Sequence, residues 1–190
     1  MFGKRRQKIS SIGIPMALYY YLYPNLWQTF FQQIGMITVL SEPTTLRTVE
    51  HAGLISEAEH CLALKIFDSH LSQLAGKVDT VFIPRILSMC REHLSCPKLG
   101  ALPDVARAGI LEANKVLTIE IDERKCHISE TLLALGQILG ISNSVNVSAV
   151  EIALGAMRIA QEELNQDLET CKELTLLVLG HPCFYSKGFG

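Results

Sequence analysis

The sequence predicts an α/β protein with a Rossmann-like fold, in which an open, mostly parallel sheet carries helices on both faces. Short apolar runs alternate along the chain with segments whose apolar residues recur every three or four positions. The length of 190 residues and the hydrophobic content of 48% suit one such domain, because ordinary domains run roughly 100 to 200 residues.

The first part of the chain predicts a β-α-β unit. The apolar run 8–14 is typical of a buried strand, and the run 36–40 predicts the next one. Between them, Pro24 suits the first position of a helix over 24–34, whose apolar residues lie at four-residue intervals, and Gly35 ends it. Two parallel strands joined by a helix follow from this pattern.

A second helix is predicted from Ser56 to Gly76. Ser56 and Glu59 match the spacing of a capping box, which satisfies free amides at a helix start. The preceding segment 41–45 (SEPTT) is predicted as a loop with helix-starting chemistry. On this prediction Cys61 lies within the first two turns of the helix.

The third strand is predicted over 78–84, and a loop over 85–100 follows it. A short helix over 102–109 then leads to a fourth strand over 115–122.

The last third of the chain predicts two helices and one strand. The helices cover 128–139 and 148–168, and the apolar run 174–180 predicts a fifth strand. Ten residues without a helical pattern follow that strand. We therefore expect one domain over 1–179 and the beginning of a truncated second domain over 180–190.

Charge and hydropathy exclude two classes of partner. The net charge of −2 lacks the basic excess that nucleic-acid binding needs, although Lys4, Arg5, Arg6 and Lys8 form a local cluster. The sequence has no uninterrupted run of about 18 apolar residues, so it predicts no membrane span. Its N-terminal segment lacks a signal-peptide cleavage site. We expect a cytoplasmic protein that binds neither nucleic acid nor membranes.

The six cysteines are predicted to be reduced thiols, because the cytoplasm disfavours disulfides. Ligands of an open parallel sheet gather beyond the carboxyl ends of its strands, so a site is expected on the loop 85–100. Cys96 lies on that loop beside Lys98, and Cys61 lies near a helix N-terminus. Both thiols are placed to ligate a soft metal or an iron–sulfur cluster.

Spacing alone leaves other interpretations open. There is no C-x-x-C pair, and cysteines are among the most often buried residues, so each could be core filler; Cys171 lies on an apolar helix stripe and Cys90 is interpreted as lining its loop. Cys126 and His127 predict either a divalent-cation site or an ordinary polar loop. Four further histidines are expected to be solvated or helix-capping: His51, His60, His70 and His93.

Two common catalytic motifs are absent from the sequence. It has neither a Gly-rich phosphate loop nor a G-x-S-x-G turn. Nucleotide hydrolysis and serine-hydrolase chemistry are therefore disfavoured.

Several motifs together resemble one family, the acyl-CoA dehydratase activase-related proteins, which are relatives of the 2-hydroxyacyl-CoA dehydratase subunits of anaerobic bacteria. The resemblance covers nearly the whole chain. The motifs that carry it are IGIPMALYYYLYPNLWQTFF (12–31), SEPTT (41–45), EHCLALKIFDSH (59–70), VDTVFIPRILS (78–88), SCPKLGALPD (95–104) and LGHP (179–182).

The resemblance implies two Rossmann-like domains that hold a [4Fe–4S] cluster between them. Cys61 and Cys96 match the two cysteine motifs of the first domain, and a third protein ligand is expected outside this chain. Arg85 and Lys98 are then expected to offset the charge of the cluster or to hold a carboxylate or phosphate of the substrate. This chain departs from the family pattern at Met16, where an arginine is usual, at His60 and Leu62–Ala63 around the first cysteine, and at Cys183.

The implied function is that of an electron-accepting component in an ATP-dependent dehydratase or reductase system. An activator protein with its own cluster would pass an electron to this cluster, and a CoA ester would be the substrate. The isolated chain is expected to be inactive as an enzyme. Two alternatives remain: a cluster-free interaction or assembly domain that self-associates through exposed faces, and an ordinary small-molecule binding domain.

Overall fold

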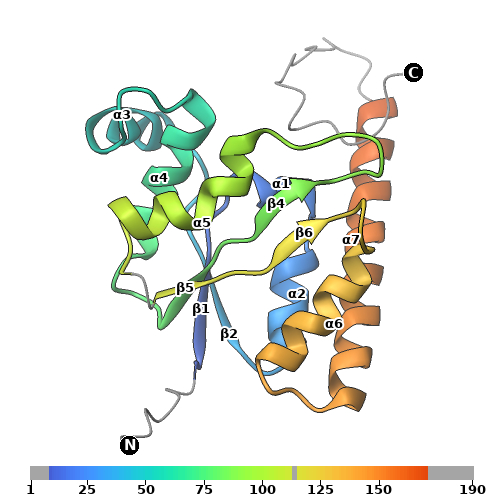
Figure 1. Cartoon of the computed structure of the whole chain (residues 1–190). Helices are drawn as coiled ribbons and strands as arrows, with labels where there is room; N and C mark the ends of the chain where they lie inside the picture. Colours follow the sequence, from blue (N-terminus) through green and yellow to red (C-terminus); the bar gives the residue numbers. More distant parts are fainter. Residues whose placement is uncertain (1–8, 113–114, 171–190) are drawn as a thin grey trace, which may run out of the picture.

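The computed structural model describes residues 9–112 and 115–170, with side chains through residue 166, and confirms the predicted α/β architecture (Figure 1). Four parallel strands form the main sheet in the order β2-β1-β3-β5, and a second parallel sheet pairs β4 with β6. The elements in chain order are β1 (Ser11–Ile14), α1 (Tyr19–Leu22), α2 (Leu26–Gln33), β2 (Ile37–Leu40), α3 (Leu46–Ile55), α4 (Leu62–Leu74), β3 (Thr80–Phe82), β4 (Arg85–Ser88), α5 (Pro97–Gly109), β5 (Val116–Leu117), β6 (Glu120–Asp122), α6 (Ile128–Ile138) and α7 (Asn143–Thr170).

Helices cover both faces of the sheet, with α4 and α5 on one face and α2, α6 and α7 on the other (Figure 1). The strand order explains this arrangement. The chain steps from β1 to β2 in one direction and from β2 to β3 in the opposite one, so right-handed crossovers bring α2 and α4 to opposite faces. Because a crossover helix runs back against its strands, α4 and α5 both begin at the edge where the strands end.

The predicted loop over 85–100 is wrong at both of its ends. Residues Arg85–Ser88 form β4, and α5 already begins at Pro97. The chain stays extended past Pro84, since the amide of Ile83 donates to Leu117 (2.8 Å) and the amide of Arg85 donates to Ile119 (2.9 Å). Proline lacks an amide, so it interrupts the ladder without turning the chain. The predicted third strand, 78–84, therefore holds β3 and is followed at once by β4, and the predicted fourth strand, 115–122, is divided into β5 and β6.

The helix start predicted at Ser56 is also wrong. An additional helix, α3, begins at Leu46 with Thr45 as its N-cap. The hydroxyl of Thr45 accepts from the amide of Thr48, and the Thr48 hydroxyl accepts from the amide of Thr45. Ser56 is the residue that ends α3. The next helix, α4, has Cys61 as its N-cap, so this cysteine precedes the first turn.

A cluster of aromatic side chains forms the centre of the core. Tyr19, Trp27 and Phe31 surround Phe82 of β3, mostly in edge-to-face contacts, and Phe67 packs against the ring of Tyr19. The hydroxyl of Tyr19 donates to the carbonyl of Phe82. This contact fixes the short helix α1 against the end of the sheet.

Helix α7 begins at Asn143, before the predicted start at 148, because it packs closely against α6. Asn146 is fully buried, and its amide nitrogen donates to the carbonyl of Leu133 at 2.8 Å. Its side chain lies directly against Gly136. Among the described residues, no helix has the length and apolar character needed to cross a membrane. The predicted strand 174–180, the segment 180–190, Cys171 and Cys183 lie outside the described residues.

Candidate functional site

Cys61 and Cys96 occupy equivalent positions at the starts of two helices. Cys61 is the N-cap of α4 and Cys96 is the N-cap of α5, and neither side chain makes a capping hydrogen bond. The thiol of Cys61 is exposed, and Cys96 is half-buried against the core. Free amides at a helix N-terminus favour negatively charged groups, so both thiols lie where an anionic ligand is stabilised.

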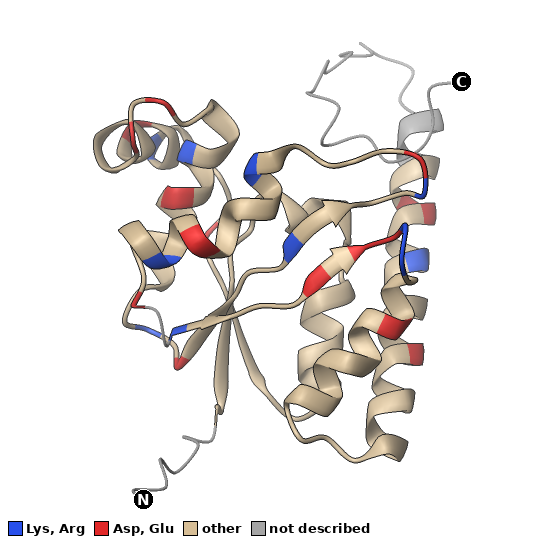
Figure 2. Cartoon of the chain, in the orientation of Figure 1, with Lys and Arg blue, Asp and Glu red and all other residues tan. Residues whose placement is uncertain are grey.

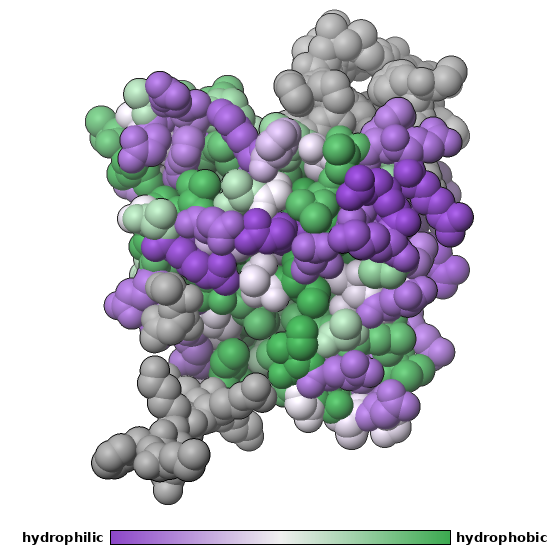
Figure 3. All heavy atoms as spheres, viewed as in Figure 1, coloured by the Kyte–Doolittle hydropathy of each residue, from purple (hydrophilic) through white to green (hydrophobic). Residues whose placement is uncertain are grey.

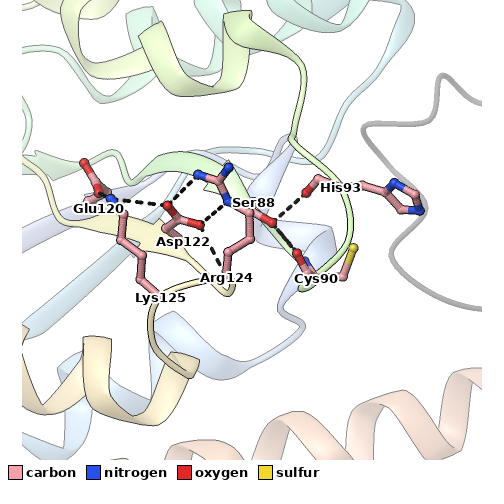
Figure 4. Close-up of polar contacts among 7 residues, drawn as sticks. All are labelled: Ser88, Cys90, His93, Glu120, Asp122, Arg124 and Lys125. Atoms are coloured by element: carbon pink, nitrogen blue, oxygen red, sulfur yellow. Dashed lines mark hydrogen bonds and ion pairs between the residues drawn. The ribbon is translucent and has the colours of Figure 1, made fainter.

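The buried hydroxyl of Ser88 organises the loop that leads to Cys96 (Figure 4). It contacts the carbonyls of Cys90 and His93, the latter at 2.6 Å, and accepts from the amide of Cys90. The amide of Ser95 then donates to the carbonyl of Leu87 at 2.8 Å, which returns the chain to β4. The loop therefore leaves and rejoins the strand at adjacent residues, and it delivers Cys96 beside the end of β4.

Three consecutive polar residues of α4, namely Asp68, Ser69 and His70, are buried and anchor the segments around Cys61. The carboxylate of Asp68 pairs with Nδ1 of His60 at 2.8 Å, which holds the turn just before Cys61. The hydroxyl of Ser69 bonds to Nδ1 of His51 at 3.0 Å and so ties α3 to α4. Cys61 is thereby held by contacts that originate in the middle of its own helix.

The side chain of His70 joins the loop after β2 to α4. Its Nδ1 lies 2.8 Å from Oγ of Ser41, and its Nε2 lies 2.9 Å from Oγ1 of Thr44. Since the amide of Met16 donates to Oγ of Ser41 at 2.7 Å, the Ser41 hydroxyl is free to donate to Nδ1 of a neutral imidazole. Burial lowers the pKa of His70. The expectation of a solvated or capping histidine is wrong here, because the ring is fully buried.

This network makes stability depend on pH. The pKa of His70 lies below the ordinary value of 6.5 when the chain is folded, so the unfolded chain binds more protons below that pH. The free energy of unfolding is therefore fully retained above about pH 6.5 and falls as the pH drops below it. Urea unfolding between about pH 5 and pH 8 measures this slope.

The pH slope should disappear in a His70→Asn variant, because the amide oxygen can accept from Ser41 without titrating. The control is His127→Asn, since His127 is exposed. An unchanged slope in His70→Asn would contradict this assignment.

The two basic residues expected at the site have defined partners. The Nζ of Lys98 donates to the carbonyl of Glu59 at 3.1 Å. The guanidinium of Arg85 donates to the carbonyl of Gly100 and pairs with Asp104 at 2.6 Å. The ion pair with Arg85 also lowers the pKa of Asp104. Arg85 thus fastens α5 to β4, and Lys98 links α5 to the turn before α4.

A second polar cluster lies at the ends of β4 and β6 (Figure 4). The carboxylate of Asp122 accepts from Nε of Arg124 at 2.8 Å, from its terminal nitrogen at 2.7 Å, and lies 3.3 Å from Nζ of Lys125. The hydrogen bonds from Arg124, and then that from Lys125, lower the pKa of Asp122. The acid is fully engaged by its neighbours and serves to close the turn after β6.

Cys126 and His127 serve the start of α6. His127 is the N-cap of this helix and accepts from the amide of Ser129, while the thiol of Cys126 lies 3.6 Å from the hydroxyl of Thr131. Of the two interpretations, the polar loop agrees with these contacts. Within residues 9–112 and 115–170, no group of three or more Cys, His, Asp or Glu side chains could hold a metal ion.

Exposed apolar side chains lie on α3 and at the start of α4. Leu46, Leu54 and Leu62 have exposed fractions of 74%, 84% and 63%, whereas the residues that α3 buries are Thr48 and Ala52. Hydrophobic residues reach the surface over α3 in Figure 3, and acidic and basic residues are scattered along α3, α4 and α5 in Figure 2. Helix α3 thus turns its largest apolar side chains outward.

Comparison with known proteins places the chain in a family. The family model described as CoA enzyme activase uncharacterised domain matches residues 11–188. No curated protein and no solved structure matches the chain. The match spans β1 to α7 and both thiols described above.

Proposed function

This chain belongs to the family of CoA enzyme activase uncharacterised domains, and we propose from this that it is an iron–sulfur redox module. In this proposal Cys61 and Cys96 supply two thiolate ligands to a [4Fe–4S] cluster, and the remaining protein ligand comes from outside the chain. The observation that supports it best is the placement of both thiols at helix N-termini on the carboxyl edge of the sheet, without competing hydrogen bonds.

The chemistry of these residues fits such a group. Thiolates are the usual protein ligands of iron–sulfur clusters. The N-termini of α4 and α5 favour the negative charge of a thiolate-ligated cluster. Two ligands from one chain leave the set incomplete, which agrees with a cluster held between this chain and another domain or subunit.

When bound, the cluster would supply one-electron transfer at low potential. The residues of this chain would hold it, screen it and set its potential. The ammonium of Lys98 and the amides of the two helix ends would offset its charge, while Arg85 keeps α5 in place. We further propose that an ATP-dependent activator protein with its own cluster is the electron donor, that a CoA ester is the final acceptor, and that the system operates in the cytoplasm.

Anaerobic purification followed by reconstitution with iron and sulfide tests the proposal. We expect a coloured protein that retains iron and sulfide in equal amounts after gel filtration. The reconstitution mixture contains a small thiol that can take the ligand position left open by this chain, so a colourless protein that retains neither iron nor sulfide would contradict the proposed function.

The outward leucines of α3 favour a second candidate function, a domain that acts through assembly without a cluster. Contiguous exposed apolar side chains often mark a protein interface. In that case the chain would self-associate and bind no iron. Light scattering distinguishes the two candidates: a monomer that binds iron favours the redox module, and an iron-free oligomer that dissociates in Leu54→Ser favours assembly.

A further inference from the structure

We infer that Lys98 is a positioning residue that sets the separation of the two thiols. Its ammonium group ties the start of α5, where Cys96 lies, to the turn that ends at Cys61. The inference rests on the proposed function, since the thiol pair is the proposed cluster site. It assigns Lys98 a role that exists before any cluster binds.

The hydrogen bond from Lys98 to Glu59 starts from a well-held part of α5. Lys98 follows Cys96 by two residues, and Pro97 between them restricts the backbone at the first helical position. The amide of Leu99 donates to the carbonyl of Cys96 at 2.9 Å, so Cys96 is already part of the first turn. A restraint on the side chain of Lys98 therefore restrains the whole helix start.

The turn before α4, which carries the acceptor of this hydrogen bond, is also held in place. The acceptor is the carbonyl of Glu59, and the next residue, His60, pairs with the buried carboxylate of Asp68. The amide of His60 also donates to the carbonyl of Glu57 at 3.1 Å, which closes the turn. The carbonyl that Lys98 binds is thus fixed in direction by the same contacts that hold Cys61.

These contacts form one continuous path between the two cysteines. It runs from Asp68 through His60 to the carbonyl of Glu59, and from there through Lys98 to the helix start at Cys96. Among the side-chain hydrogen bonds of the described residues, the bond from Lys98 joins residues 57–61 to residues 95–98. Removing it leaves each helix start intact but takes away this direct side-chain link between them.

A bridging experiment on the metal-free chain tests the inference. The four other cysteines are replaced in the full-length chain (Cys90→Ser, Cys126→Ser, Cys171→Ser, Cys183→Ser), so that Cys61 and Cys96 remain. The probe is dibromobimane, which becomes strongly fluorescent after alkylating two neighbouring thiols. Peptide mapping confirms that the bridge joins these two residues.

Three variants in this background isolate the contribution of Lys98. Lys98→Met removes the donor and keeps an apolar stem, Lys98→Arg keeps a cationic donor, and Lys65→Met removes a nearby charge on α4 whose side chain makes no hydrogen bond in the described structure. We expect Lys98→Met to form the bridge up to about fivefold more slowly, because a solvent-exposed charged interaction shifts an equilibrium by at most roughly that factor. Lys98→Arg should restore most of the rate, and Lys65→Met should match the parent.

The outcomes separate this inference from the proposed function. An unchanged bridging rate in Lys98→Met, with the fold intact by circular dichroism, would overturn the positioning role and leave cluster binding untouched. A slowed rate in Lys98→Met together with a parent that binds no iron would support the positioning role and contradict the redox module. A parent that forms no bridge at all would overturn the inference, because the two thiols would not be neighbours.

Discussion

Replacing Gly136 by alanine should destabilise the protein by about 3 kcal/mol. A Cβ atom at this position would lie less than 3.0 Å from the side-chain amide atoms of Asn146. Asn146 is fully buried between α6 and α7, so it cannot move without breaking its bond to the carbonyl of Leu133. Overpacking a core typically costs about 1 to 3 kcal/mol, and losing a buried hydrogen bond adds about 1 to 3. Urea unfolding measures the loss, and the melting temperature should fall by about 10 °C.

Two further variants show whether the close contact is the cause. Gly155→Ala in α7 has no atom within 4 Å of the added Cβ, so it should be neutral or stabilising by up to about 1 kcal/mol. Asn146→Ala in the Gly136→Ala background removes the obstacle and should recover part of the lost stability. A Gly136→Ala protein as stable as the parent would show that the two helices do not pack as described.

Cys61→Ser and Cys96→Ser should each lower the iron bound after reconstitution at least about tenfold. Serine is a poor ligand for a soft iron–sulfur centre, and a site that takes two ligands from this chain would retain one. Disturbing even the surroundings of a metal ligand typically costs about 10- to 100-fold in affinity, so losing a ligand should cost no less. Cys90→Ser is the matched control, since Cys90 is half-buried on the same loop as Cys96. The Cys90→Ser protein should bind as much iron as the parent. Equal iron in all three variants, each folded by circular dichroism, would contradict the assignment.

The sequence predicted the strands of the main sheet because a strand covered on both faces must be apolar along its whole length. The runs 8–14, 36–40 and 78–84 contain β1, β2 and β3, and their residues Ile12, Ile14, Val81 and Phe82 are buried. The family resemblance is confirmed by the match over residues 11–188.

The sequence did not predict α3, for a physical reason. A helix is recognised by apolar residues on its inner face, but α3 buries Thr48 and Ala52 and exposes Leu46 and Leu54. The usable signal was local, namely the paired threonines at positions 45 and 48 that cap its start. The spacing of Ser56 and Glu59 matched a capping box by residue type alone.

The candidate site was predicted only in part. Cys61 and Cys96 were candidates from their expected places at a helix start and on the loop after a strand, and the resemblance then selected them, because their spacing has no metal-site signature. The contacts around them join residues far apart in the sequence, such as Lys98 with Glu59 and His70 with Ser41, so periodicity could not reveal them. A polar run in the middle of an apolar helix, such as residues 68–70, was the available sign of buried polar partners.

Anomalous scattering at the iron edge, from a crystal of the reconstituted chain, tests the proposed cluster site most directly because it locates the iron. We expect a peak in contact with the sulfurs of both Cys61 and Cys96, at a bond length of about 2.3 Å. A peak at Cys90 or Cys126 instead, or crystals of the reconstituted chain without one, would contradict the proposed cluster site.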